Sequence, residues 1–360
     1  MTSHQKSDVD EFDELAAVAQ RGGSETIAKS YRYLRLAMVG LLLCLAVAVL
    51  YQSWRQGWNL LGSVSAYYYT PAQALFVSGL IGLGACMIAL KGTAPVEDVF
   101  LNLGGVFAAI VAIVPTGRNA DHRAAVRACR EAGTPLLTEK ASTTGLDCPT
   151  VEALEDATKA NVDNNLFTLL VVGAVALLAS LVIAWRDGTL KRRADRDAKR
   201  TKRNFLWGFG VALGLWLAVL ILRLASLQWI IDNGHWIAAV LLFVCIFVVA
   251  VANARRVERE KSGDGPQRAV KESLDAARGL IAMQRPGQYI WIARLMLLVA
   301  AVTLALWRAN VITLFWVEAL VFLLFMLFWT VQTFELESRQ VVILRPVATV
   351  DRSQAGHRPQ

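Results

Sequence analysis

The chain has 360 residues, of which 55% are hydrophobic and 18% are charged, and its formal net charge is +8. An ordinary soluble domain is about 45–50% apolar, so the average alone decides little. The distribution is informative, because the apolar residues lie in long runs and the charges lie between them. This pattern excludes an ordinary soluble globular domain and predicts an all-α polytopic transmembrane helix bundle.

The apolar runs predict about eight spans. A helix needs about 20 mainly apolar residues to cross a hydrocarbon core of about 30 Å. The predicted spans, in chain order, are Leu36–Tyr51, Pro71–Leu90, Val99–Pro115, Leu166–Trp185, Phe205–Ala225, Trp236–Ala254, Tyr289–Trp307 and Val311–Thr333.

The placement of Lys and Arg predicts that both termini lie in the cytoplasm. One set of alternate inter-span segments holds 27 of the basic residues and the other set holds 8. Basic residues favour cytoplasmic loops. The predicted cytoplasmic parts are therefore the tail 1–35, the basic loop 186–204, the segment between spans six and seven, and the tail 334–360; the two span groups are 36–185 and 205–333.

The run Lys191–Arg203 is the most basic segment of the chain. At the inner membrane surface it would attract anionic lipid. A nucleic-acid-binding arm is the rival interpretation, but no aromatic residue is interleaved for base stacking. The sequence therefore predicts the lipid bilayer as partner and no nucleic acid.

Three further helices are expected outside the spans. The exterior loop 116–163 would hold Ala120–Arg130 and Pro149–Ala160, and the cytoplasmic segment 266–284 reads as an amphipathic helix lying at the headgroups. The acidic segment Asp8–Ala19 is mildly amphipathic, and Gly22 and Gly23 are expected to break it.

The five cysteines divide by location. Cys129 and Cys148 both fall in the exterior loop, where a disulfide can persist, so the sequence predicts that they are bonded. A metal site at Cys129, Cys148, His122 and Asp121 is the weaker alternative, because zinc-type ligand spacing is absent. No metal or cofactor is predicted.

Ionisable groups within the spans are the best candidates for a functional site. Glu318 lies deep in the last span, and its side chain is too short to reach water. It is expected either to pair with Arg223, near the outer end of the fifth span, or to bind a proton or cation in a cavity. Three other polar candidates lie toward the inner face: Asp98, Asn102 and Arg294.

Small residues predict close helix contacts at two places. One is the Gly210-Val-Ala-Leu-Gly214 motif, and the other is the face of span two that carries Ser78, Gly82 and Cys86. The four histidines are placed in tails or exterior loops, and no HExxH or GxSxG pattern occurs, so histidine-based hydrolysis is not predicted.

The stretch Ser63-Val-Ser65-Ala-Tyr67-Tyr68-Tyr69-Thr70-Pro71 precedes the second span, and Asp98 and Asn102 follow it. It resembles uncharacterised bacterial multi-pass membrane proteins with an S-x-S-A-Y-Y-x-T motif at this position. The resemblance covers roughly residues 35–116 and implies no known activity. It implies that Ser63, Ser65, Tyr67, Tyr68, Tyr69, Thr70, Asp98 and Asn102 belong to one unit.

These patterns leave the function open between three classes. A small-solute or ion-coupled transporter with a Glu318–Arg223 centre comes first. A structural or accessory membrane protein, binding a partner or forming a homo-oligomer, comes second, and a lipid-modifying enzyme comes third. Arg outnumbers Lys by 27 to 10, which is typical of a high-GC genome and favours a bacterial plasma membrane.

Overall fold

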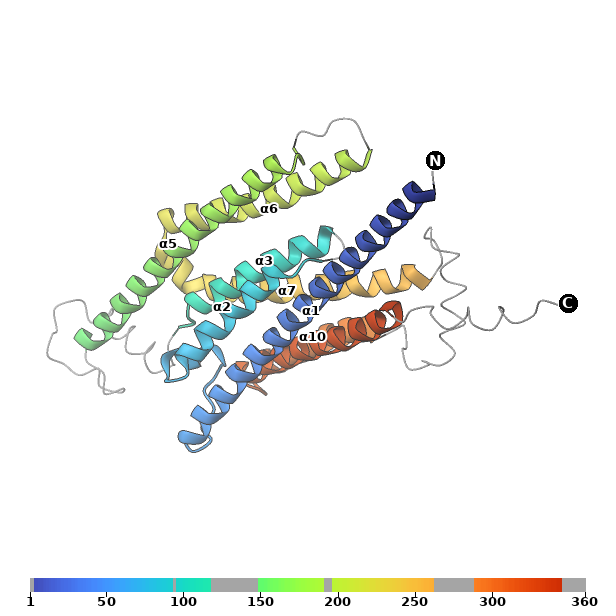
Figure 1. Ribbon diagram of the computed structural model, residues 1–360. Helices are drawn as coiled ribbons and strands as arrows, with labels where there is room; N and C mark the ends of the chain where they lie inside the picture. The colour runs from blue at the N-terminus through green and yellow to red at the C-terminus, as the bar shows by residue number, and fades with distance from the viewer. Residues whose placement is uncertain (1–2, 93–94, 118–147, 191–195, 262–287, 345–360) are drawn as a thin grey trace.

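The computed structural model describes residues 3–92, 95–117, 148–190, 196–261 and 288–344, and in these ranges it contains helices and no strand. Figure 1 shows long helices running side by side. In chain order they are α1 (Ser3–Arg55), η1 (Ser65–Tyr69), α2 (Gln73–Ala89), α3 (Pro95–Ile113), α5 (Cys148–Arg186), α6 (Arg196–Ala225), α7 (Leu227–Lys261), α9 (Gln288–Arg308) and α10 (Leu314–Leu344).

Local residue chemistry explains several of the boundaries. Pro95 opens α3, where the missing N–H costs no hydrogen bond. Gly57 follows α1 with φ +70°, a backbone conformation that glycine adopts without steric cost. Ser226 separates α6 from α7, and its Oγ accepts a hydrogen bond from the N–H of Trp229 at 3.3 Å, so it caps the start of α7.

Six of the described helical segments are long and apolar enough to cross a membrane: Lys29–Arg55, Pro95–Ile113, Thr150–Arg186, Lys199–Ala225, Leu227–Asn253 and Leu314–Thr333. The apolar helix α2 has 17 residues and is shorter than these. A bundle of such helices is compatible with an integral, multi-pass membrane protein.

Six helices form a closed ring. Helix α1 packs on α2, α2 on α3, α3 on α7, α7 on α9, α9 on α10, and α10 packs back on α1. Helices α5 and α6 form a hairpin that lies beside this ring against α3 and α7 (Figure 1). Their outer faces carry many exposed apolar side chains, such as Val172, Leu178 and Leu224, which suits contact with lipid.

The closest backbone approach lies between α2 and α3. A Cβ atom added to Gly84 would lie 2.5 Å from the carbonyl oxygen of Gly105, and the reciprocal distance is also 2.5 Å. By contrast, a Cβ atom added to Gly210 or Gly214 would meet nothing within 4 Å. The expected close contact at the GxxxG motif of α6 is therefore wrong for the described chain, whereas Gly82 on α2 does lie against Leu41.

Several predicted loops are helical instead. Helix α1 continues through Gly22 and Gly23, and α5 joins the expected loop helix 149–160 to the following span without a break. Helix α7 begins at Leu227, so the segment 226–235 is almost entirely helix rather than loop. The expected helices 120–130 and 266–284 lie outside the described residues, apart from nothing that bears on the site.

Candidate functional site

A short turn before α2 directs Ser65 into the bundle. Ser63 Oγ accepts a hydrogen bond from the N–H of Ala66 at 3.0 Å, and Thr70 Oγ1 donates to the carbonyl oxygen of Tyr67 at 2.7 Å. These side-chain bonds close the two ends of η1. Ser65, between them, is only 5% exposed.

Glu318 receives both hydrogen-bond donors of Ser65. The backbone N–H of Ser65 donates to Glu318 Oε2 at 3.0 Å, and Ser65 Oγ donates to Glu318 Oε1 at 2.7 Å. Glu318 lies in the second turn of α10, within the span Leu314–Thr333. The carboxyl group is therefore held by a neutral partner that lies 253 residues away in the chain.

His235 completes the chain of hydrogen bonds. Its Nε2 lies 3.0 Å from Ser65 Oγ, and its Nδ1 lies 2.7 Å from the carbonyl oxygen of Val114, just after α3. The side chain is 2% exposed and lies in the span Leu227–Asn253 of α7. The expectation that all histidines lie in tails or exterior loops is therefore wrong for His235.

We call Glu318, Ser65 and His235 the polar triplet. It links η1, α7 and α10, and through Val114 also the end of α3. A carboxyl, a hydroxyl and an imidazole in hydrogen-bond contact can bind and pass a proton. Their location within a span-level bundle makes them a functional-site hypothesis in their own right.

The tyrosines of η1 support the polar triplet without joining it. Tyr67 is fully buried, its hydroxyl hydrogen-bonds Ser53 on α1, and its ring lies 6.3 Å from that of Phe315. Tyr69 donates its hydroxyl proton to the carbonyl oxygen of Thr116 at 2.8 Å. The two hydroxyls tie the turn to α1 and to the segment after α3, which fixes the position of Ser65.

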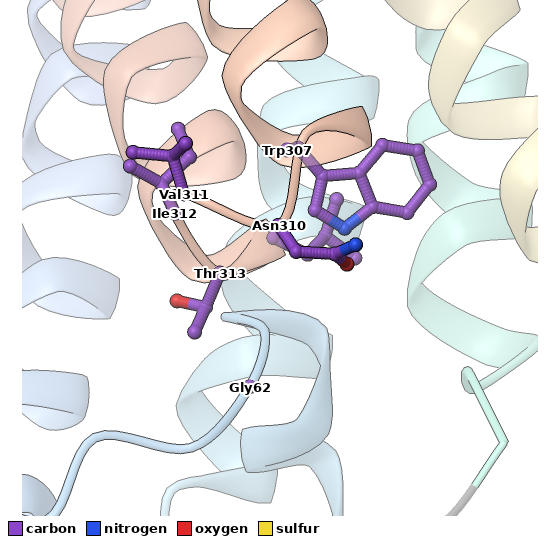
Figure 2. A pocket seen from close by; sticks show the side chains of 7 residues that line it. Gly62, Trp307, Asn310, Val311, Ile312 and Thr313 are labelled. Carbon is purple, nitrogen blue, oxygen red and sulfur yellow. The ribbon is translucent and has the colours of Figure 1, made fainter.

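A shallow depression of about 370 Å³ opens next to the polar triplet (Figure 2). In Figure 2 the side chains of Trp307 and Asn310 lie beside each other above the loop that carries Gly62. The N–H of Phe315 donates to the carbonyl oxygen of Gly62 at 2.9 Å. Gly62 and Leu314 belong to the lining, so the depression comes within a few residues of both Ser65 and Glu318 in the chain.

The predicted pairing of Glu318 with Arg223 is wrong. Arg223 Nη2 lies 2.8 Å from Asp163 Oδ1 on α5, and the guanidinium lies over the ring of Phe167 at 5.4 Å. Arg223 ends α6, which belongs to the lateral hairpin, whereas Glu318 lies on the ring helix α10. The hairpin therefore supplies its own acidic partner.

The three polar candidates near the other end do not form one cluster. Asp98 accepts a hydrogen bond from the N–H of Gly92, Asn102 is exposed on α3, and Arg294 is exposed with its guanidinium 5.5 Å from the ring centre of Trp291. Neither Asp98 nor Asn102 is joined to the turn 63–70 by a hydrogen bond in the described residues.

The buried polar pair at that end is Glu97 with Asn253, which the sequence reasoning missed. Asn253 Nδ2 donates to Glu97 Oε1 at 3.0 Å, and both side chains are buried. This bond ties the start of α3 to α7 at the opposite end of the ring from the polar triplet.

Cysteine and metal chemistry add nothing to the site. Cys44, Cys86 and Cys245 are free thiols in the described part of the chain. The predicted disulfide involves Cys129, which lies outside the described residues, as do His122 and Asp121; Cys148 begins α5. Among the residues that the structure describes, no group of three His, Cys, Asp or Glu side chains could hold a metal ion.

Sequence reasoning placed Glu318 and Ser65 among the candidates but omitted His235. The pair Asn233-Gly234 reads as a turn, which put His235 in a loop. The apolar residues from Leu227 to Ile231 were the available signal that the helix starts earlier. Comparisons with protein-family models, with curated proteins and with solved structures found no match.

Proposed function

We propose that the protein is a proton-coupled transporter of a small solute or ion in a bacterial plasma membrane, and that the polar triplet is its proton-binding site. The observation that carries this proposal is the buried contact of Ser65 Oγ with both Glu318 Oε1 and His235 Nε2, at 2.7 and 3.0 Å. Titratable groups inside spans are costly and usually mark proton or substrate pathways.

The surroundings support this assignment. The residues contributed by three distant segments meet within the described bundle, where a purely apolar contact would have sufficed for packing. The depression near Gly62 and Asn310 gives the triplet a nearby opening at that end of the bundle.

We further propose eight spans with both termini in the cytoplasm. In Figure 1 the start of α1, the end of α5, the start of α6 and the end of α10 lie at one end of the bundle. The helical residues at that end include Lys29, Arg186, Lys199, Arg200 and Arg203. Basic residues favour the cytoplasmic side and its anionic lipid, which puts the polar triplet toward the exterior.

The test is electrical recording from protein reconstituted in proteoliposomes on a solid support. Pools of amino acids, organic acids, sugars and monovalent cations are applied with and without a pH gradient. We expect one pool to give a proton-driven current that Glu318→Gln abolishes. Ser63→Ala is the matched control, because Ser63 lies two residues from Ser65 and accepts its bond from the N–H of Ala66. If no pool and no pH jump moves charge, the proposal fails.

One observation favours a second function, acyl transfer at Ser65. His235 Nε2 could take the Ser65 proton while Oγ attacks an ester carbonyl, and His235 would then return the proton to the departing alkoxide. The Val114 carbonyl would hold the imidazole in the required tautomer.

A fluorophosphonate probe separates the two functions. Covalent labelling that Ser65→Ala and His235→Gln abolish and Ser63→Ala preserves would establish the acyl-transfer function. Absence of labelling in protein that gives a proton-driven current would exclude it.

A further inference from the structure

The hydrogen bonds of the polar triplet determine how many protons it holds. The carbonyl oxygen of Val114 only accepts, so His235 Nδ1, at 2.7 Å, must carry a hydrogen. The backbone N–H of Ser65 only donates, so Glu318 Oε2, at 3.0 Å, must accept. The two remaining contacts, from Ser65 Oγ to Oε1 and to Nε2, share the one hydroxyl hydrogen of Ser65.

Two arrangements satisfy both remaining contacts. In the first, Ser65 Oγ donates to an ionised Glu318, and Nε2–H of a positively charged His235 donates to Ser65 Oγ. In the second, protonated Glu318 donates to Ser65 Oγ, and Ser65 Oγ donates to Nε2 of a neutral His235. Both arrangements hold one proton on the Glu318–His235 pair beyond the Nδ1 hydrogen, and both have a net charge of zero.

Removing or adding a proton breaks this match. Without the shared proton, Glu318 Oε1 and His235 Nε2 both need a donor, and Ser65 has only one hydroxyl hydrogen to offer. With a second proton, both neighbours donate to Ser65 Oγ, and the Ser65 hydroxyl hydrogen has no acceptor in the triplet. An unpaired polar group costs about 1–3 kcal/mol when buried, so the one-proton state is favoured.

Other ionisable groups on the packed elements have separate partners or are exposed. On η1, the hydroxyls of Tyr67 and Tyr69 bind Ser53 and the Thr116 carbonyl, and the ring of Tyr68 packs against Phe76. On α7, Asp232 accepts from Gln228 Nε2 at 3.0 Å. Arg55 at the end of α1 and Arg308 at the end of α9 are exposed. In the described residues, none of these groups hydrogen-bonds to Glu318 or His235.

We propose that Glu318 and His235 share a single proton, and that the Ser65 hydroxyl relays it between them. When the Ser65 hydroxyl hydrogen moves to Nε2, the carboxyl proton moves to Ser65 Oγ, and the reverse step restores the first arrangement. The net charge of the buried site stays constant during the transfer, which avoids the cost of creating an isolated charge. This inference deepens the proposed function, because it names the group through which the bound proton moves.

The test reads both ends of the relay in the full chain. His4, His122 and His357 are changed to Gln, so that His235 is the single histidine, and the protein is placed in lipid nanodiscs. Nitrogen-15 NMR reports which ring nitrogens of His235 are protonated. Infrared difference spectra between this protein and its Glu318→Gln variant report the protonated fraction of Glu318.

We expect Nδ1 to be protonated in every sample. We also expect the fraction of His235 with Nε2 protonated and the fraction of Glu318 protonated to add up to one near neutral pH. In Glu318→Gln, the side-chain amide can donate to Ser65 Oγ, so His235 should be neutral. Ser65→Ala should abolish the reciprocity between the two signals, and Ser63→Ala should preserve it.

An unprotonated Nδ1 would overturn the inference, as would wild-type protein in which Glu318 is ionised while His235 is neutral. Preserved reciprocity in Ser65→Ala would overturn the relay. The wild-type and Glu318→Gln spectra decide the proton count even if Ser65→Ala does not fold. Because these spectra require no transport, a shared proton without any current would remove the proposed function and leave this inference standing.

Discussion

Replacing Glu318 by Leu and by Gln separates a hydrogen-bonding role from simple packing. Leu is similar in size but offers no acceptor, so the buried Ser65 N–H that donates to Glu318 Oε2 would lose its partner. The Ser65 hydroxyl can still donate to His235 Nε2, so one donor is orphaned rather than two. One unpaired buried donor costs about 1–3 kcal/mol, and this is the expected loss in the free energy of unfolding.

Gln preserves every contact. Its amide oxygen can accept from the Ser65 N–H, its amide nitrogen can donate to Ser65 Oγ, and the hydroxyl hydrogen then goes to His235 Nε2. The expected destabilisation is less than about 1 kcal/mol. The earlier expectation of a larger loss rested on an unpaired Arg223, which the structure pairs with Asp163 instead.

The assay is reversible unfolding in mixed micelles of lipid, mild detergent and sodium dodecyl sulfate. Glu152, an exposed glutamate on α5, provides the control, because its Leu and Gln variants should unfold alike. If Glu318→Leu is as stable as Glu318→Gln, the Ser65 N–H does not depend on the carboxyl group, and the reasoning is refuted.

Three other predictions follow from the same contacts. Gly84→Ala should destabilise the fold by about 1–3 kcal/mol, because its Cβ would meet the backbone of α3, whereas Gly214→Ala should be neutral or stabilising; equal unfolding free energies would contradict the packing. Arg223→Gln and Asp163→Asn should show a coupling energy of about 0.2–1 kcal/mol in a double-mutant cycle, since the pair is 19% and 44% exposed, and Arg223→Gln should be additive with Glu318→Gln. In a cysteine-free background, an impermeant maleimide added to intact cells should label a cysteine at position 57 and spare one at position 199, and the reverse result would invert the proposed orientation.

Much of the fold was predictable, and only part of the candidate site was. Glu318 was recognised because a lone carboxylate in an apolar run is costly wherever the helix lies. Ser65 was singled out by the motif before α2, without any indication of its partners. His235 was missed because an Asn-Gly pair two residues earlier favours a turn, and the tertiary structure carries the helix through it instead.

The sequence by itself determined the all-helical character and the approximate position of the apolar segments. These depend on local properties, namely runs of about 20 apolar residues and the hydrogen bonds that each helix makes within itself. The tertiary structure alone decided which polar groups meet. Ser65 lies 170 residues from His235 and 253 residues from Glu318, and Arg223 found Asp163 rather than Glu318. Such partners depend on the rotation and axial shift of each helix against its neighbours, which the packing of contacts such as Gly84 on Gly105 sets and which no local pattern encodes.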